Sequence, residues 1–311
     1  MNLLYLAKAG YGGWVSFTIH LAQKYKWNLY KISQKGERKK RLLGYDTYYQ
    51  NLSLDQVEEL EEPILITACS HHYTRYLKYL EGQYIVIHDP TELKGDMKEY
   101  LPYMNVITIR ESVHRLLKEK FNIKNTLILH PLYDFPIPDI EIQNKKGAIS
   151  ISRIDFDKNI DILINANDLL KEPIEIYGCI NDLYKYHKLR NTNFDKYYKG
   201  RFGKDFDTII ALLKNKKYCV DMSSIYKDGG GSQYTFLEAI KLDCCLILNK
   251  KWVDNMPTKF INGYNCFIVE SPEELALVIE RDHDTTEIVK NARKMLEDHL
   301  NCDWNTVVGI D

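Results

Sequence analysis

A run of three glycines in the second half of the chain stands directly before a segment with helical spacing of apolar residues. The glycines are residues 229–231, between Asp228 and Ser232, and apolar residues follow from Tyr234 to Ile240. A glycine loop that opens a helix presents free backbone N–H groups and the positive end of the helix dipole, which suit a phosphate. Glu238, in the first turns of this helix, can face a ribose attached to that phosphate. The alternative is a capped helix that follows a flexible surface loop.

Two cations stand five residues apart, in a loop between a predicted strand and a predicted helix. Arg153 and Lys158 predict a diphosphate clamp, because a guanidinium forks onto phosphate oxygens and an ammonium adds a point charge. Asp155 and Asp157 lie between them and offer ligands for Mg²⁺, although the two cations already supply neutralisation. The alternative is a solvated charged loop.

A glycine-rich turn also follows the first predicted strand, at Gly10, Gly12 and Gly13. It lacks the spacing of a dinucleotide-binding fingerprint, because position 15 is not glycine, and no acidic residue ends the second strand. NAD binding is therefore disfavoured. Such a turn lets a substrate approach the backbone, or it simply reverses the chain.

Three further positions follow predicted strands, where a doubly wound sheet presents its ligand-contacting residues. His88 and Asp89 come directly after the strand over 84–87, and the pair can bind and polarise a substrate hydroxyl. Asp89 can alternatively be the cap of a strand-ending turn. Gly178 ends a later strand, where backbone groups can meet a nucleobase.

One basic cluster lies just after the second predicted strand. Runs of this kind are usually solvated loops, but a polyanionic acceptor such as DNA would use them for phosphate contacts. The cluster consists of Lys35, Arg38, Lys39, Lys40 and Arg41.

Several other classes of site are disfavoured. His71, His72, His114 and His130 have no carboxylate or cysteine at metal-binding spacing. The G-x-S-x-G nucleophile elbow and the P-loop Gly-Lys-Ser/Thr are both missing from the sequence.

Composition indicates a globular chain in a reducing compartment. The 311 residues carry a formal net charge of −1, so no global basic field points to nucleic acid or membrane. The seven cysteines are odd in number and form no C-x-x-C pair, which favours buried thiols. The N-terminus does not resemble a signal peptide, and no apolar run approaches the ~20 residues of a membrane span. We therefore expect a cytoplasmic protein with no stable membrane insertion, and a monomer.

Strand and helix patterns alternate along the chain in two series, which predicts parallel sheets. The predicted strands cover 2–6, 27–32, 64–68, 84–87, 105–108, 126–129, 147–152, 174–177, 218–222 and 244–248. The main predicted helices cover 13–25, 112–120, 159–170, 209–214, 234–242, 272–281 and 285–300. A proline-rich linker over 130–138 separates the two series.

The predicted fold is α/β, with two Rossmann-like doubly wound domains and a cleft between them. The expected domains are 1–138 and 139–284, with 285–311 as a C-terminal helix that packs back on the first domain.

Over essentially its whole length the chain resembles retaining glycosyltransferases of the two-Rossmann (GT-B) type, in the family 4-like group. The matching segments are the glycine turn near residue 12, His-Asp-Pro at 88–90, Ser-Arg-x-Asp-x-x-Lys at 152–158, the glycine loop with Leu-Glu-Ala at 237–239, and residues 263–276. The resemblance implies transfer of a hexose from a nucleoside diphosphate sugar, such as UDP-glucose, to an acceptor hydroxyl. It implies no additional cofactor and no metal.

The resemblance also implies roles for individual residues. The catalytic set would be His88, Asp89, Arg153, Lys158 and Asp228. The donor-binding set would be Gly12, Gly13, Ser152, Gly178, Gly229, Gly230, Gly231, Ser232, Gln233, Tyr234, Thr235 and Glu238. The acceptor-binding set would be the basic cluster at 35–41.

The chain departs from the family at one position, because the first glutamate of the usual Glu-x₇-Glu pair falls on Gly230. The sugar contact of that glutamate is then vacant, or is taken by Asp228 or by N–H groups of the glycine loop. With this departure, residues 10–13, 85–89 and 234–238 resemble the DNA α-glucosyltransferases of T-even phages. This favours a 5-hydroxymethylated pyrimidine in viral DNA as the acceptor. The alternatives are a surface or lipid-linked glycan as acceptor, and a non-catalytic binder of nucleotide sugars or nucleic acid.

Overall fold

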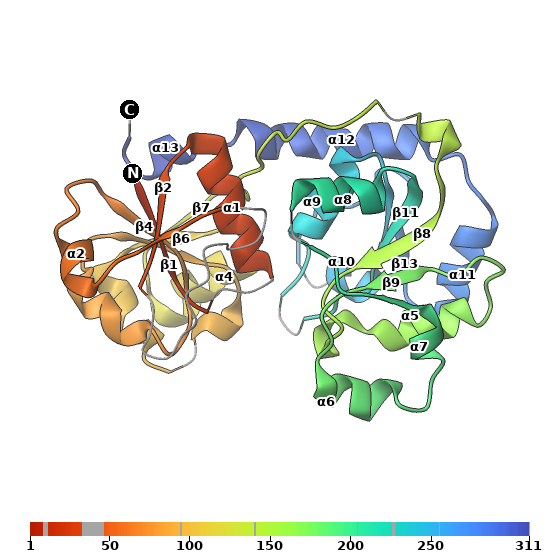
Figure 1. Cartoon of the computed structure of the whole chain (residues 1–311), viewed down its shortest axis with the longest axis horizontal. Coiled ribbons are helices and arrows are strands. Elements are labelled where there is room, and N and C mark those ends of the chain that lie inside the picture. Colours follow the sequence, from red (N-terminus) through yellow and green to blue (C-terminus); the bar gives the residue numbers. More distant parts are fainter. Residues whose placement is uncertain are drawn as a thin grey trace. The chain divides into compact units, whose positions relative to one another are not determined.

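The structure is a computed structural model that describes residues 1–8, 12–32, 47–93, 95–139, 141–203, 205–225, 228–254 and 256–310. The chain folds into two compact units (Figure 1). Unit 1 comprises residues 1–134 and 298–311, and unit 2 comprises residues 135–297. The predicted domain boundary at 138 lies four residues beyond this division, and the C-terminal segment predicted at 285–311 is itself divided at residue 298.

Unit 1 is built around a seven-stranded sheet in which every pair of neighbouring strands is parallel. The strand order is β3-β2-β1-β4-β5-β6-β7. The strands are β1 (Asn2–Leu6), β2 (Asn28–Lys31), β3 (Gln50–Asn51), β4 (Ile64–Cys69), β5 (Tyr84–Ile87), β6 (Asn105–Thr108) and β7 (Asn125–Leu127).

Unit 2 repeats this arrangement with a six-stranded parallel sheet in the order β10-β9-β8-β11-β12-β13. The strands are β8 (Lys146–Ile151), β9 (Glu175–Tyr177), β10 (Tyr198–Gly200), β11 (Lys216–Asp221), β12 (Cys245–Asn249) and β13 (Phe267–Val269). In both sheets the first three strands run 3-2-1 to one side, and the later strands run to the other side as 4-5-6-7 in the first sheet and 4-5-6 in the second, which is the doubly wound order. The predicted fold class is confirmed.

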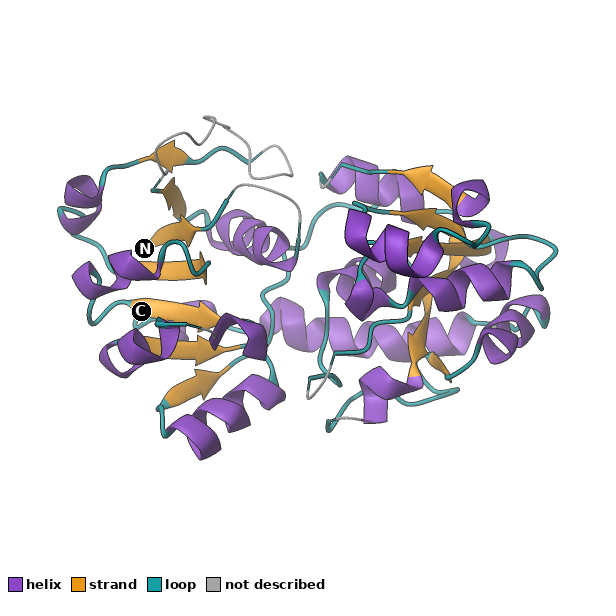
Figure 2. Ribbon diagram, turned by 90° about the horizontal axis from the view of Figure 1, so that it is seen from below, coloured by secondary structure: helices purple, strands orange, loops and turns teal. Residues whose placement is uncertain are grey.

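Helices surround the strands in both units (Figure 2). The α-helices of unit 1 are α1 (Gly13–Tyr25), α2 (Leu54–Glu58), α3 (Met97–Tyr100), α4 (Glu111–Arg115) and α13 (Trp304–Val307). Those of unit 2 are α5 (Ile160–Asn167), α6 (Asp182–Tyr184), α7 (Phe194–Tyr197), α8 (Phe206–Leu213), α9 (Tyr234–Lys241), α10 (Lys250–Asp254) and α11 (Pro272–Glu280). The helix α12 (Thr286–Asn301) begins in unit 2 and ends in unit 1.

Short 3₁₀ and π helices complete the secondary structure. The 3₁₀ helices are η1 (Thr74–Tyr79), η2 (Pro90–Leu93), η3 (Leu101–Tyr103), η5 (Ile142–Asn144) and η6 (Phe156–Lys158). The π helices are η4 (Leu116–Lys120) and η7 (Lys185–Leu189). The single helix predicted over 112–120 is thus α4 followed by η4.

Burial explains which strands the sequence reveals. All residues of the central strands β1, β4 and β12 are buried, as expected for strands covered on both faces, and they form continuous apolar runs. The prediction missed the edge strands β3, β10 and β13. Each has only two or three residues, and β3 and β10 also have a polar composition that carries no apolar run. In the part of the chain that the structure describes, no helix is both long and apolar enough to cross a membrane.

Candidate functional site

Two clusters of polar side chains lie at the carboxyl ends of strands, one in each unit. The Lys158 cluster of unit 2 comprises Arg153, Asp155, Asp157, Lys158, Asp221, Ser223 and Gln233. The Glu92 cluster of unit 1 comprises Trp14, Thr67, His88, Asp89 and Glu92. Carboxyl ends next to the point where the strand order reverses are where doubly wound sheets bind ligands.

The Lys158 cluster lies at the carboxyl ends of the neighbouring strands β8 and β11, between which the strand order of the second sheet reverses. Arg153 to Lys158 follow β8, Asp221 ends β11, and Gln233 immediately precedes α9. Because β8 and β11 are parallel neighbours, their carboxyl ends meet at one edge of the sheet. The topology therefore brings together residues that are 63 to 75 positions apart in the chain.

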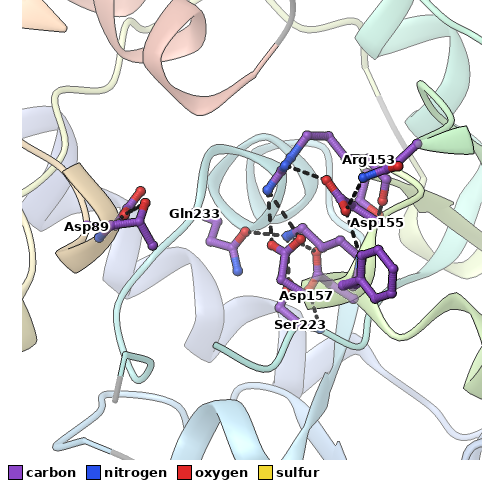
Figure 3. Close-up of polar contacts among 12 residues, drawn as sticks. Asp89, Arg153, Asp155, Asp157, Ser223 and Gln233 are labelled. Carbon is purple, nitrogen blue, oxygen red and sulfur yellow. Dashed lines mark hydrogen bonds and ion pairs between the residues drawn. The ribbon is translucent and has the colours of Figure 1, made fainter. Parts of the chain in front are cut away.

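Lys158 is the buried centre of this cluster. Its ammonium Nζ donates to Asp221 Oδ2 at 3.3 Å, to Ser223 Oγ at 2.6 Å and to Gln233 Oε1 at 2.8 Å; Figure 3 labels Ser223 and Gln233. The side chain of Lys158 is 8% exposed and that of Asp221 is 1% exposed. An ammonium has three N–H donors, so these three acceptors satisfy it completely.

Arg153 is held by two carboxylates of its own loop. One guanidinium nitrogen lies 2.8 Å from Asp155 Oδ2, and the other lies 3.1 Å from Asp157 Oδ2 (Figure 3). Its side chain is 52% exposed, unlike that of Lys158. Arg153 and Lys158 bring two positive charges against three carboxylates, namely Asp155, Asp157 and Asp221. The two predicted clamp cations are thus brought into one cluster, and each is already neutralised within it.

Backbone contacts fix the loop that carries these residues. Asn159 has the left-handed backbone angles φ 45° and ψ 50°, and its Nδ2 donates to Met222 O at 2.7 Å. Ser224 N donates to Asp157 O at 2.8 Å, and Asn181 Nδ2 donates to Asp155 Oδ1 at 2.9 Å. The loop after β8 is therefore bound to the segments that follow β9 and β11.

The glycine loop has a backbone that only glycine can adopt at Gly230. Its φ is +68°, and a Cβ there would lie 2.8 Å from Pro257 O and 2.9 Å from Met256 O. Gly230 N also donates to Trp252 O at 2.7 Å. A glutamate at this position, as in the resembled family, would force the loop to move. The loop conformation therefore requires the glycine by which the sequence departs from the family pattern.

Hydrogen bonds also hold the rest of the glycine loop. Trp252 Nε1 donates to Gly231 O at 3.1 Å, and Thr258 Oγ1 donates to Gly230 O at 2.7 Å. Asp228 is fully buried, and its Oδ1 accepts from Gly229 N at 2.9 Å. Asp228 thus orders the loop backbone, and its predicted sugar contact stays a prediction.

The helix α9 begins directly after this loop. Gln233 is its N-cap residue and makes no side-chain capping bond, because its Oε1 accepts from Lys158 instead. Thr235 Oγ1 donates to Ile151 O at 3.4 Å, while Tyr234 and Glu238 are buried. Glu238 has no exposed surface, so the predicted ribose contact also stays a prediction. Ser232 is half-buried between the glycines and α9.

Gly178 has a packing role that the sequence does not reveal. A Cβ at this position would lie 1.8 Å from Ser152 O, so any other residue would separate the segments that follow β8 and β9. Its N donates to Gly200 O at 3.0 Å. Its predicted donor contact is untested by these observations.

In unit 1, His88 is a buried, neutral imidazole. Its Nε2 lies 2.7 Å from the carbonyl oxygen of Thr67, which can only accept, so Nε2 carries the hydrogen. Burial lowers the pKa of His88 to about 4. The ring packs edge-on against Phe17, with centroids 4.7 Å apart. Nδ1 has no partner among the described residues and is left as a hydrogen-bond acceptor.

Asp89 is half-buried and caps the turn after β5. Its Oδ1 accepts from Thr91 N at 2.7 Å and from Thr91 Oγ1. The hydrogen bonds expected of a capping Asp89 are therefore present, and the predicted contacts of His88 and Asp89 with a substrate hydroxyl stay predictions.

Glu92 and Trp14 complete this cluster, and the sequence patterns had pointed to neither of them. Trp14 Nε1 donates to Glu92 Oε1 at 2.8 Å, which joins the start of α1 to the turn after β5. Burial raises the pKa of Glu92 well above its ordinary value. A signal was available, because Glu92 stands four residues after His88 at a strand end. Gly12 and Gly13 form the adjoining start of α1, with Gly12 as N-cap.

Other predicted site residues lie outside the described residues. These are Gly10 and the whole basic cluster of Lys35, Arg38, Lys39, Lys40 and Arg41. Within the described ranges, no group of three or more histidine, cysteine or acidic side chains is arranged to hold a metal ion.

The fold is that of GT-B glycosyltransferases, with two parallel-sheet units of the doubly wound type. No protein-family model and no curated protein sequence matches the chain. Solved structures do match over almost its whole length. The predicted resemblance to this class, including phage T4 α-glucosyltransferase, is confirmed at the level of the fold.

Three of these matching structures are glycosyltransferases that cover almost the whole chain. Phage T4 α-glucosyltransferase, in complex with UDP and a 13-mer DNA containing an HMU base, matches with a TM-score of 0.72 and 10% identity, over 99% of this chain and 97% of that chain. HepE of Anabaena, in complex with UDP and glucose, matches with a TM-score of 0.67 and 13% identity, over 99% of this chain and 97% of that chain. A glycosyltransferase from Rickettsia africae matches with a TM-score of 0.61 and 14% identity, over 99% of this chain and 96% of that chain.

Proposed function

We propose that this protein is a glycosyltransferase that moves a hexose from a UDP-sugar to an acceptor hydroxyl. The observation that carries the proposal is the Lys158 cluster. It joins a buried ammonium and a guanidinium at the strand-reversal point of the second sheet, and its residue Gln233 follows the glycine loop and is the N-cap residue of α9. The fold likeness to structures that hold UDP or UDP-glucose supports the same donor.

The donor diphosphate would bind at the Lys158 cluster. Arg153 and Lys158 would stabilise the negative charge that develops on the leaving diphosphate, together with N–H groups of residues 231–232. The N–H groups of Gly229 and Gly230 already donate to Asp228 Oδ1 and Trp252 O. Preorganised donors of this kind supply a large share of the rate in enzymes that expel an anion. The roles of Asp228 and Glu238 toward sugar and ribose follow from the family resemblance and belong to this proposal.

The acceptor hydroxyl would be oriented by His88 and Asp89. A neutral imidazole whose Nδ1 carries no hydrogen can accept the hydrogen bond of a hydroxyl, and a nearby carboxylate can polarise it. We propose retention at the anomeric carbon. The hydroxyl first donates to His88 Nδ1 and then turns its hydrogen to a donor phosphate oxygen, which takes the proton as the bond from the sugar to the diphosphate breaks and the bond to the acceptor oxygen forms. The configuration of the product, determined by NMR from a donor of known configuration, tests retention directly.

A hydroxymethylated DNA base is the acceptor that we favour. The support is the fold likeness to an α-glucosyltransferase bound to DNA that contains an HMU base. A base in duplex DNA would have to leave the stack, which costs a few kcal/mol. An enzyme that modifies viral DNA would work in the cytoplasm of the host cell. A surface or lipid-linked glycan is the second candidate acceptor.

Sugar transfer from radiolabelled UDP-glucose tests the proposal. The acceptors to compare are hydroxymethylpyrimidine DNA, plain DNA and simple glycosides, with UDP release measured in the absence of acceptor. We expect label on the hydroxymethylated DNA alone. Label on the glycosides alone would show that the acceptor is a glycan and not DNA. If there is neither transfer nor UDP release, the protein is a binding protein and not an enzyme.

Variants with matched controls connect the activity to the cluster. Arg153→Ala and Lys158→Ala should each lower transfer by ~100-fold, the scale for removing one donor from a developing anion. Arg115→Ala is the control for Arg153, because Arg115 is similarly exposed and pairs with Glu111 four residues away. Lys171→Ala is the control for Lys158, because its side chain is 89% exposed. Unchanged transfer in both cluster variants would refute the clamp.

A further inference from the structure

Glu92 is a buried carboxyl directly beside His88 and Asp89, and neither the sequence nor the fold likeness assigns it a role. It lies in η2, the short helix that follows β5, and the residue is 8% exposed. A carboxyl so deeply buried needs either a cationic partner or a bound proton. Its hydrogen bonds show which of its two oxygens is available for a proton.

The two oxygens of Glu92 have different surroundings. Oε1 accepts from Trp14 Nε1 at 2.8 Å and from His88 N at 3.2 Å. Oε2 is buried and has no hydrogen-bond partner among the described residues. Both donors therefore converge on one oxygen, and Oε2 is the oxygen on which a proton can reside.

Charged and titratable groups on three elements face this carboxyl. Burial has the largest effect on the pKa of Glu92 and raises it, and Asp89, which follows β5, raises it further. The hydrogen bonds from Trp14 and His88 N lower this pKa, as does Arg110, which follows β6. The Cys69 thiol at the end of β4 also faces Glu92, and burial raises its pKa, so it stays neutral. His88 is neutral as well, because burial lowers its pKa.

We propose that Glu92, as a neutral carboxylic acid, is a positioning residue for the acceptor hydroxyl. It joins Trp14 at the start of α1 to the backbone of His88, and so fixes the imidazole whose Nδ1 receives the hydrogen bond of the hydroxyl. This inference rests on the acceptor role of His88 that the proposed function contains.

The proton on Glu92 matters for the chemistry of His88. An ionised Glu92 would place a second carboxylate beside Asp89 and would favour the imidazolium form of His88. Imidazolium has N–H on both nitrogens and can accept no hydrogen bond. A neutral Glu92 therefore keeps His88 in the form that can accept from a hydroxyl.

Two substitutions separate positioning from packing. Glu92→Gln keeps the shape and an uncharged acceptor for Trp14 and His88, whereas Glu92→Leu removes the acceptor. Glu92→Leu should lower kcat for transfer by roughly tenfold to a hundredfold, the scale for small displacements in an active site. Its Kd for UDP should stay unchanged. Glu92→Gln should recover most of that loss. Glu111→Gln is the control, because Glu111 is a partly exposed carboxylate of the same unit.

A pH profile and an infrared spectrum report the proton itself. We expect the wild-type rate to fall as pH rises through the Glu92 pKa, and this alkaline fall to be lost in Glu92→Gln. The infrared difference between the two proteins at neutral pH should show a carboxylic acid C=O band. These measurements remain decisive even where Glu92→Leu does not fold.

Three results would overturn the inference. They are a carboxylate band in the difference spectrum, an alkaline fall that persists in Glu92→Gln, or a folded Glu92→Leu with wild-type kcat. A wild-type protein that transfers no sugar overturns the proposed function, and the acceptor role of Glu92 with it. Transfer that is insensitive to Glu92 overturns only the inference.

Discussion

Both clusters lie at carboxyl ends of parallel strands, yet they neutralise their buried groups in opposite ways. The Lys158 cluster pairs opposite charges: a buried ammonium meets Asp221, and Arg153 meets Asp155 and Asp157. In the Glu92 cluster the buried groups are neutral, because burial raises the pKa of Glu92 and lowers the pKa of His88. One cluster thus holds paired full charges, and in the other Glu92 and His88 are uncharged.

This difference has a physical consequence for each cluster. Paired charges are insensitive to pH near neutrality but sensitive to the loss of either partner, which leaves the other charge buried alone. Groups held neutral by burial are sensitive to pH instead, because unfolding restores their ordinary titration. Substitutions and pH changes in each cluster can therefore show whether the two behave in these two ways.

The largest expected effect is at Lys158. Lys158→Ala should lower the free energy of unfolding by about 3–5 kcal/mol, because it leaves the buried Asp221 carboxylate without its cation. Denaturant unfolding monitored by fluorescence measures the change. The double variant Lys158→Met, Asp221→Asn should lose much less of the free energy of unfolding, since it buries no unpaired charge.

A control for Lys158 exists in the same unit. Lys216 pairs with Glu175 at 2.7 Å, but both side chains are more exposed, at 21% and 32%. Lys216→Ala should lower the free energy of unfolding by less than about 1 kcal/mol. Equal losses at Lys158 and Lys216 would contradict the view that burial makes the Lys158 pair critical.

The second effect is the pH dependence of unit 1 at His88. Its folded pKa of about 4 lies below the unfolded value of 6.5, so its contribution is present above pH 6.5 and is lost as pH falls toward 4. Lowering the pH from 7 to 5 should lower the free energy of unfolding by about 2 kcal/mol through this group. His88→Gln should remove that part of the slope. A slope that does not change in His88→Gln would show that His88 is not buried neutral.

The third effect is at Gly230. Gly230→Ala should lower the free energy of unfolding by about 1–3 kcal/mol, because the backbone has φ +68° and the new Cβ would meet two carbonyl oxygens. Gly263→Ala is the control, since its φ is +73° with nothing within 4 Å of a Cβ. It should cost about 1 kcal/mol. Gly230→Glu, which restores the family residue, should lower transfer rather than raise it.

The sequence predicted the sheets well because their central strands are buried on both faces. β1, β5 and β6 were predicted with the bounds that the structure has, since continuous apolar runs ended by polar residues mark them clearly. It also predicted that Arg153 and Lys158 would belong together. The spacing of two cations after a strand carries that information locally.

Other parts of the site depend on contacts between distant segments. Asp221 and Ser223 bind Lys158 across 63 and 65 positions of the chain, and Trp14 binds Glu92 across 78. Local patterns cannot show such pairs, although polar residues at strand ends are a usable signal. The need for glycine at Gly178 and Gly230 likewise comes from backbone oxygens of other segments.

The smallest expected effect is the most specific to the Lys158 cluster. Asp157→Asn removes one of the two carboxylates that hold Arg153, and so leaves more of the guanidinium's hydrogen-bonding capacity for a phosphate. Because the Arg153 side chain is half exposed, the pair contributes only ~0.2–1 kcal/mol, and the free energy of unfolding should hardly change. The affinity for UDP should rise by about twofold to fivefold, measured by calorimetry at low salt, and the gain should shrink at high salt. Asp254→Asn, which breaks the exposed pair with Lys250, should leave the UDP affinity unchanged. Weaker UDP binding in Asp157→Asn would mean that Asp157 positions Arg153 for the diphosphate instead of competing with it.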